Sequence, residues 1–151
     1  MNVTWDEVFT GVKHLASNYK QFFSAARLPV FIFVGRGGLT LGSLLARFID
    51  IQTALYLPIS HYHGDRLIPL RPYRYAWATP LGAASKVFLV DDIYDSGETI
   101  EYISTHFLTT GAVHEFAALT LYTREENKFK QGIHVFWKTS PKGVWLNFPW
   151  E

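Results

Sequence analysis

The stretch KVFLVDDIYDSGETI, residues 86–100, joins a run of apolar residues to four acidic residues that fall within eight positions. These residues are Asp91, Asp92, Asp95 and Glu98. Two carboxylates about 4 Å apart repel each other by roughly 4 kcal/mol at an effective dielectric constant near 20. We therefore expect a bound cation or polar ligand to stabilise this cluster, at the point where a buried strand gives way to a turn.

The composition is that of a globular chain, because hydrophobic residues make up 48% of the 151 residues and charged residues 18%. That length suits one domain with a core, and we expect a single domain over residues 1–151. Lys and Arg number 14 against 13 Asp and Glu, giving a net charge of +1. Bulk charge therefore does not indicate binding to nucleic acid or a membrane. No cysteine is present, which excludes disulfides, thiolate zinc sites and a cysteine nucleophile and fits a cytoplasmic protein.

No targeting or membrane segment is predicted. The first residues, MNVTWDEVFTGVK, lack a basic start followed by an apolar core, so they do not form a signal peptide. The most apolar run, LPVFIFVG, is far too short to span a bilayer.

Helices and strands are expected to alternate along the chain, which indicates an α/β domain with a largely parallel sheet. The expected helices are residues 4–22, starting at a capping box of Thr4 and Glu7, residues 39–50, and a segment that follows the acidic cluster and ends near Gly111. The expected strands are residues 29–34, 52–60, 86–90, 114–123 and 133–139. Residues 61–80 are predicted to form a long loop or irregular hairpin, and such loops often act as lids. In such sheets, ligands bind beyond the carboxyl ends of the strands.

The adjacent Asp91 and Asp92 point to more than a helix cap. Capping of the next helix explains Asp95 and Glu98 but leaves the adjacent pair unexplained. Two carboxylates at a strand end suit a magnesium ion, a sugar diol or both, since magnesium is bound by one or two carboxylates together with phosphate oxygens and water.

The following DSGET, residues 95–99, supplies groups that suit an anion. Ser96 and Thr99 offer hydroxyls, Gly97 permits a close approach of the backbone, and the helix N-terminus presents unpaired N–H groups. A metal or diol on one side and a phosphate on the other describe a sugar phosphate.

A second anion site is predicted at VGRGG, residues 34–38. Its glycines expose backbone N–H groups and Arg36 can grip two phosphate oxygens at once, although a tight turn with a solvated Arg36 is the alternative. A dinucleotide-binding fingerprint fails because Thr40 stands at the place of the third glycine, and no GK[ST] exists, which excludes a P-loop.

These motifs carry a resemblance to the type I phosphoribosyltransferases. VFLVDDIYDSGET, residues 87–99, resembles their phosphoribosyl-diphosphate (PRPP) motif, which has apolar residues, two acidic and two apolar residues, and Asp-Thr/Ser-Gly-x-Thr. GRGGLTLGSLLA, residues 35–46, resembles their diphosphate-binding turn and the helix after it. VTWDEVFTGVKHLA, residues 3–16, and WLNFPWE, residues 145–151, are similar to the short bacterial and archaeal xanthine–guanine phosphoribosyltransferases.

The resemblance implies the type I phosphoribosyltransferase fold, a mostly parallel twisted sheet flanked by helices with a small hood from the C-terminal tail. Residues 61–80 would be a flexible active-site loop and residues 139–151 a base-binding tail. The implied activity belongs to purine salvage: transfer of the 5-phosphoribosyl group from PRPP to xanthine, guanine or hypoxanthine, with Mg²⁺ and release of diphosphate, in a homodimer or homotetramer.

The resemblance also implies roles for the motif residues. Asp91 and Asp92 would meet the ribose hydroxyls, Asp92 would also reach the magnesium ion, and Asp95 would be the catalytic group near N7 of the purine. The diphosphate turn implies a non-proline cis peptide bond, here at Gly35–Arg36. The remaining PRPP-binding residues would be Arg36 and Gly37 at the diphosphate, and Ser96, Gly97, Glu98 and Thr99 at the 5-phosphate.

On the base side, the resemblance implies that Trp145 stacks on the purine and that the backbone of Leu146 reads its edge, whereas Trp150 is expected to be plain core. Arg124 stands where the family usually has a Lys that donates to the 6-oxo group, and Arg can also donate there. The preferred purine and a contribution of Glu151 to the metal site stay open. The candidates to close over the phosphates are Arg66, Arg71 and Arg74.

Three other readings compete with this enzyme. A regulator on the same scaffold would bind PRPP or a nucleotide without catalysis, but the acidic pair, Asp95 and a base-stacking tail together favour the enzyme. A nucleic-acid module on the Arg-rich residues 66–77 is disfavoured by the near-neutral charge. A pyrimidine-type transferase is disfavoured by the Trp-Leu tail.

Overall fold

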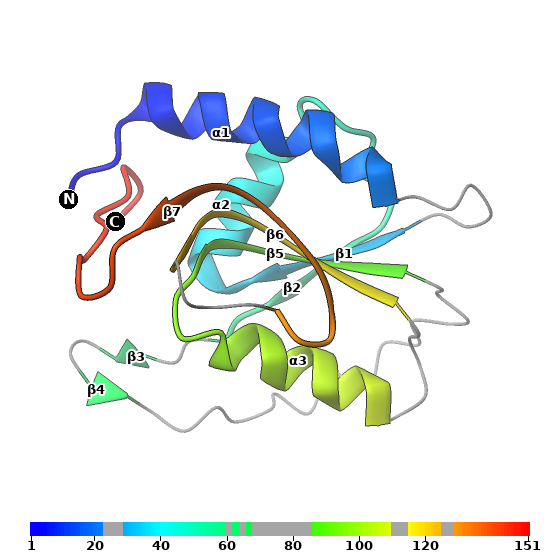
Figure 1. Cartoon of the computed structure of the whole chain (residues 1–151). Coiled ribbons are helices and arrows are strands. Elements are labelled where there is room, and N and C mark those ends of the chain that lie inside the picture. The colour runs from blue at the N-terminus through cyan, green and yellow to red at the C-terminus, as the bar shows by residue number, and fades with distance from the viewer. Residues whose placement is uncertain (23–28, 60–61, 64–65, 68–85, 110–114, 125–128) are drawn as a thin grey trace.

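The computed structural model describes residues 1–22, 29–59, 62–63, 66–67, 86–109, 115–124 and 129–151 (Figure 1). The helices are α1 (Trp5–Asn18), a 3-10 helix that follows it (Tyr19–Phe22), α2 (Gly35–Leu45) and α3 (Glu98–Thr109). The strands are β1 (Val30–Val34), β2 (Ala54–Leu57), β3 (Tyr62–His63), β4 (Arg66–Leu67), β5 (Lys86–Tyr94), β6 (Glu115–Arg124) and β7 (Gly132–Ser140).

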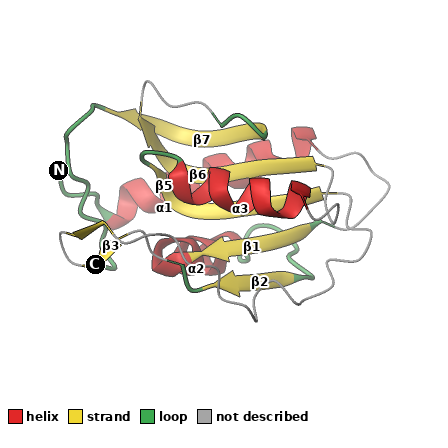
Figure 2. Cartoon of the chain, turned by 90° about the horizontal axis from the view of Figure 1, so that it is seen from below, coloured by secondary structure: helices red, strands yellow, loops and turns green. Residues whose placement is uncertain are grey.

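Five strands form one sheet in the order β2-β1-β5-β6-β7, and each neighbouring pair is parallel (Figure 2). This confirms the predicted α/β architecture with a largely parallel sheet. The chain leaves β1 toward β2 on one side and later returns to β5 on the other side, so the direction of winding reverses between β1 and β5. Ligands of open α/β sheets bind at the carboxyl ends of the strands at such a switch point.

Helices cover both faces of the sheet, with α1 and α2 on one face and α3 on the other (Figure 1). Phe31 of β1 and Phe88 of β5 are fully buried, and their rings stack with centroids 5.0 Å apart. The apolar faces of α1 and α3 form part of the core. Val8, Val12 and Leu15 of α1 belong to one buried cluster, and Ile100, Ile103 and Phe107 of α3 belong to the other.

The predicted capping box at the start of α1 is present. The backbone N–H of Glu7 donates to the Thr4 hydroxyl at 3.3 Å, and the backbone N–H of Thr4 donates back to the Glu7 carboxylate at 3.1 Å. The predicted cap at Gly111 and most of residues 61–80, including Arg71 and Arg74, lie outside the described residues.

Several predicted boundaries are wrong: α2 ends at Leu45 rather than at residue 50, and β2 spans Ala54–Leu57 rather than residues 52–60. Two further errors lie at the switch point. Helix α2 begins at Gly35 rather than at residue 39, so GRGG is its first turn. A β-carbon on Gly38 would overlap the carbonyl oxygen of Val90, so glycine allows α2 to start directly against β5. Strand β5 continues to Tyr94 rather than ending at Val90, because β6 runs beside it and pairs Asp91 with Thr120 and Tyr94 with Thr123.

The N-terminal residues lie beside the C-terminal tail (Figure 1). The backbone N–H of Val3 donates to the carbonyl of Asn147 at 2.9 Å, and the N–H of Asn147 donates to the carbonyl of Met1 at 2.9 Å. Within the described ranges, no helix has both the length and the apolar character needed to cross a membrane.

Candidate functional site

A cleft of about 550 Å³ opens at the carboxyl ends of β1 and β5. The lining residues from β1, β5 and the helix starts, here called the strand wall, are residues 34–37, Asp91, Asp92, Ile93, Asp95 and Thr99. The lining residues from β6 and the tail, here called the tail wall, are Arg124, Trp145, Leu146, Phe148, Trp150 and Glu151. Nine of the predicted site residues line the cleft: Arg36, Gly37, Asp91, Asp92, Asp95, Thr99, Arg124, Trp145 and Leu146. The other three, Ser96, Gly97 and Glu98, lie in the turn before α3 and at its first residue.

The acidic pair occupies the last part of β5. The backbone N–H of Asp92 donates to Oδ1 of Asp91 at 2.9 Å. Burial and the neighbouring charge of Asp92 raise the pKa of Asp91 well above its usual range. Burial also raises the pKa of Asp92 to about 6; the charge of Glu151 adds to this rise, while a hydrogen bond from Trp150 opposes it. Both carboxyls therefore lie in surroundings that penalise their negative charge, which is an arrangement that a bound cation relieves.

The first turn of α2 packs directly on this pair. A β-carbon on Gly37 would overlap the carboxylate of Asp92, so a residue without a side chain is required there. The peptide bond between Gly35 and Arg36 is trans, and the predicted cis bond is wrong. Gly35 instead enters the helix at a φ of 58°, a left-handed torsion that glycine adopts readily.

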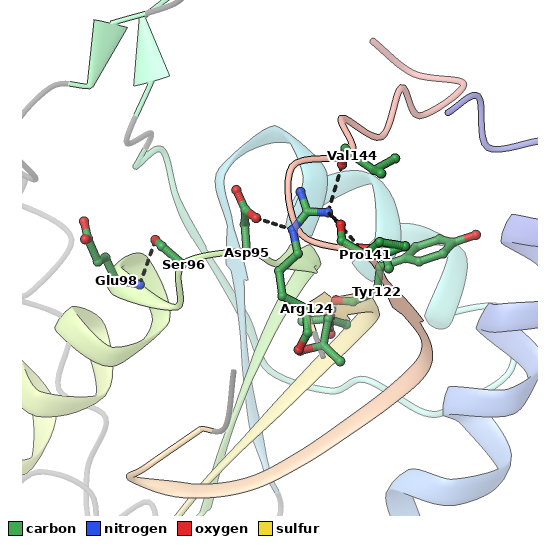
Figure 3. A network of polar contacts seen from close by, with 10 residues as sticks. Asp95, Ser96, Glu98, Tyr122, Arg124, Pro141 and Val144 are labelled. Atoms are coloured by element: carbon green, nitrogen blue, oxygen red, sulfur yellow. Dashed lines mark hydrogen bonds and ion pairs between the residues drawn. The ribbon is translucent and has the colours of Figure 1, made fainter. Parts of the chain in front are cut away.

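The turn between β5 and α3 is braced on its inner side. The backbone N–H of Glu98 donates to the Ser96 hydroxyl at 3.3 Å (Figure 3). The Tyr94 hydroxyl donates to Oε1 of Glu101 at 2.8 Å, and the same oxygen accepts from the backbone N–H of Lys130 at 2.7 Å. These contacts hold the start of α3, and its exposed N–H groups, at the edge of the cleft.

Arg124 connects the strand wall to the tail wall. Its side chain is buried, and its Nε donates to Oδ1 of Asp95 at 2.5 Å. Its Nη1 donates to the Ser140 hydroxyl at 3.0 Å and to the carbonyls of Pro141 and Val144 at 2.8 Å each (Figure 3). The resemblance implies only a base-binding role for Arg124 and does not predict that it connects Asp95 to the tail. The residue type could have indicated this second role, since a guanidinium offers several donors in a fixed fork.

The tail wall contains two tryptophans and one leucine, Trp145, Trp150 and Leu146, which differ in solvent exposure. Trp145 is 60% exposed at the cleft, and Leu146 is buried. Trp150 is only partly buried and lines the cleft, where its Nε1 donates to Oδ2 of Asp92 at 3.2 Å. The expectation that Trp150 is plain core is therefore wrong. The other lining residues to which the sequence assigns no role are Tyr56 in β2, Pro58 and Ile59 just after it, Ile93 in β5 and Phe148 in the tail.

Among the described residues, no group of three or more His, Cys, Asp or Glu side chains could hold a metal ion by itself. Asp91 and Asp92 could supply one or two carboxylate ligands to a magnesium ion whose other ligands are water and phosphate oxygens. That mode of binding is the one magnesium adopts with phosphorylated substrates.

Comparisons with known proteins identify a family and related folds. The family described as phosphoribosyl transferase domain matches residues 4–150. A xanthine-guanine phosphoribosyltransferase of Cereibacter sphaeroides is 23% identical over 99% of this chain and 86% of its own length. The fold matches a purine phosphoribosyltransferase from Pyrococcus horikoshii with a TM-score of 0.70 at 24% identity, over 100% of this chain and 93% of that chain. It also matches a hypothetical protein from Neisseria gonorrhoeae with bound ppGpp, with a TM-score of 0.75 at 19% identity, over 99% of this chain and 87% of that chain.

Proposed function

Because the chain belongs to the phosphoribosyl transferase domain family, we propose that it transfers the 5-phosphoribosyl group of PRPP to a 6-oxopurine and releases diphosphate, as in purine salvage. The name of the Cereibacter sphaeroides relative supports a purine as the acceptor. The cleft supports it further, since groups suited to a sugar phosphate and groups suited to a flat base face the same space.

The strand wall is proposed to bind PRPP. The N–H groups at the start of α2, together with Arg36 and Gly37, hold the diphosphate, and the start of α3 from Ser96 to Thr99 holds the 5-phosphate. Asp91 and Asp92 accept hydrogen bonds from the ribose hydroxyls. These roles are supported by the position of the two helix N-termini, because α2 and α3 both begin at the same edge of the sheet.

A magnesium ion fits the acidic pair. Carboxylate oxygens are hard ligands, and the partly buried Asp91 and Asp92 both have raised pKa values that a cation would offset. We propose that Asp92 holds the ion together with oxygens of PRPP. When bound, magnesium supplies positive charge to the departing diphosphate.

The tail wall is proposed to bind the purine. Trp145 stacks on one face of the ring and the backbone of Leu146 reads its edge. Among the described residues, Arg124 donates through Nε and Nη1 only, so its proposed contact with the 6-oxo group falls to Nη2. The domain assignment, residues 1–151 with a base-binding tail at 139–151, belongs to the same proposal.

The proposed reaction breaks the bond between C1 of the ribose and the diphosphate oxygen, and the electron pair leaves with diphosphate. N9 of the purine forms the new bond to C1 from the opposite face, and Asp95 accepts the proton that the purine loses at N7. Arg36 stabilises the negative charge that develops on the diphosphate. The ion pair with Arg124 holds the Asp95 carboxylate in place for this transfer.

The observation that carries the proposal is the joint position of Asp91, Asp92 and Asp95 with Trp145 around one cleft. The test mixes the protein, magnesium and PRPP with xanthine, guanine, hypoxanthine, adenine and uracil separately, and follows base absorbance and diphosphate release. We expect diphosphate release with one or more 6-oxopurines and none with adenine or uracil. Turnover with uracil alone would refute the purine assignment.

A second candidate is a non-catalytic regulator that binds PRPP or a nucleotide on the same fold. The structural likeness to the Neisseria gonorrhoeae protein with bound ppGpp is the observation in its favour. Calorimetry separates the two: a regulator would bind PRPP or a nucleotide and release no diphosphate with any base of the panel.

A further inference from the structure

We propose that Trp150 is a positioning residue for Asp92 and that, through it, the tail controls the binding of magnesium and PRPP; this rests on the proposed function. The contact that carries the inference is the hydrogen bond of 3.2 Å from Nε1 of Trp150 to Oδ2 of Asp92. It joins residues that lie 58 positions apart in the sequence. An aromatic residue of the tail would be expected to bind the purine. Trp150 instead contacts Asp92, which is proposed to bind the ribose and magnesium.

In this hydrogen bond Trp150 must be the donor and Asp92 the acceptor. An indole N–H can only donate, and an ionised carboxylate can only accept. Hydrogen bonds to charged groups are stronger than those between neutral groups. Trp150 therefore favours the charged, accepting form of Asp92 and fixes the direction in which Oδ2 points.

The start of α2 confines the Asp92 carboxylate as well. The Cα of Gly37 lies so close that a β-carbon there would overlap the Asp92 carboxylate. Because α2 and the indole both contact the carboxylate at Oδ2, its plane has little freedom to rotate. A carboxylate that is oriented before the ligand arrives loses less entropy when it binds.

The indole itself is held in place by aromatic neighbours. Its ring stacks on Phe148 with centroids 4.9 Å apart and an interplanar angle of 13°, and it contacts Trp5 of α1 at 6.0 Å. The turn that carries it is closed by two hydrogen bonds between Phe148 and Glu151, one from each backbone N–H. These contacts orient the indole so that its N–H points at Asp92. None of them involves the N–H itself, so the position of the ring does not depend on it.

The test exploits this separation with Trp150→Phe, which keeps an aromatic ring and removes the donor. The matched control is Trp5→Phe, which changes a ring in contact with Trp150 and leaves the hydrogen bond in place. Binding of PRPP in the presence of magnesium is measured by calorimetry, Tm by scanning calorimetry without ligand, and KM for PRPP and for the base in the diphosphate-release assay.

We expect Trp150→Phe to weaken magnesium-dependent PRPP binding about tenfold, the size of a lost hydrogen bond to a charged group. The KM of the base should stay close to that of the wild type, and Trp5→Phe should bind PRPP as the wild type does. The Tm of Trp150→Phe should fall only by the amount that the loss of one hydrogen bond explains. Equal PRPP binding by Trp150→Phe and the wild type would overturn the assignment, and so would an equal loss of binding for base and PRPP, because that result would mean that Trp150 only supports the tail. A wild-type protein that binds no PRPP would instead refute the proposed function, and the assignment with it.

Discussion

The two walls of the cleft are built in different ways. The strand wall comes from the ends of β1 and β5, which are neighbours in the sheet and pair from Val30 with Val87 to Phe33 with Val90. The tail wall is held by contacts between distant parts of the chain. Arg124 reaches Asp95 across 29 positions, and the N-terminal nitrogen of Met1 donates to the carbonyl of Trp145 across 144 positions.

This difference has a consequence for the energetics of the site. The geometry of the strand wall follows from the backbone of the sheet and two helix starts, so a side-chain change there alters charge more than shape. The geometry of the tail wall depends on individual hydrogen bonds, so the loss of one donor can move the whole segment. Substitutions in the strand wall should therefore affect PRPP or turnover and those in the tail wall should affect the base, except at Trp150, whose donor contacts Asp92 of the strand wall.

Asp95 lies where the walls meet, and its substitution should give the largest effect. Asp95→Asn keeps the shape of the side chain and removes the proton acceptor, so we expect kcat to fall by about 10²–10⁴. PRPP binding should persist. Steady-state kinetics together with PRPP calorimetry measures both, and Asp6→Asn on the exposed face of α1 is the control. An unchanged kcat would remove Asp95 from the chemistry.

Asp92→Asn tests the electrostatic cost that is specific to the strand wall. An acid whose pKa rises from 3.8 to about 6 on folding binds more protons in the folded state than in the unfolded state. Stability of the wild type without ligand should therefore fall as pH rises from about 4 to about 6. We expect Asp92→Asn to be more stable than the wild type at pH 7, by up to about 3 kcal/mol.

The measurement is the difference in free energy of unfolding between Asp92→Asn and the wild type, taken at pH 4 and at pH 7. Burial lowers the pKa of His134 to about 4, so both proteins lose stability as pH falls from 6.5 toward 4. The difference between them cancels this common loss. A difference that does not grow between pH 4 and pH 7 would contradict the raised pKa of Asp92.

Arg124→Lys tests the link between the walls. An ammonium cannot reproduce the fork that joins Asp95 to three acceptors in the tail, so we expect the free energy of unfolding to fall by about 2 kcal/mol. The KM of the base should rise more than the KM of PRPP. Ser140→Ala is the matched control, because it removes one acceptor and leaves the two carbonyls in place. A larger loss in Ser140→Ala than in Arg124→Lys would mean that the fork does not hold the tail.

The same contrast separates what the sequence could predict from what it could not. Val87 to Thr99 form one contiguous motif, and the capping box of Thr4 and Glu7 spans four residues, so local patterns were enough to find both. The end of β5 was misjudged because Asp91 and Asp92 look like a turn, whereas pairing with β6 keeps them in the strand. The hydrogen bond of Trp150 to Asp92 depends on packing across 58 positions, and no local pattern carries that information.

The smallest expected effect belongs to Trp145→Ala, in the tail wall. Stacking of a base on an aromatic ring contributes about 1–3 kcal/mol, and we expect the lower end because Trp145 is 60% exposed and excludes little water. That corresponds to a rise of roughly fivefold in the KM of the base, with the KM of PRPP unchanged. Phe48→Ala, which removes an aromatic side chain of similar exposure beyond the end of α2, is the control for general loss of apolar surface. A rise in the KM of PRPP instead of the KM of the base would mean that the Trp145 ring serves PRPP, and its assignment to the base would then be wrong.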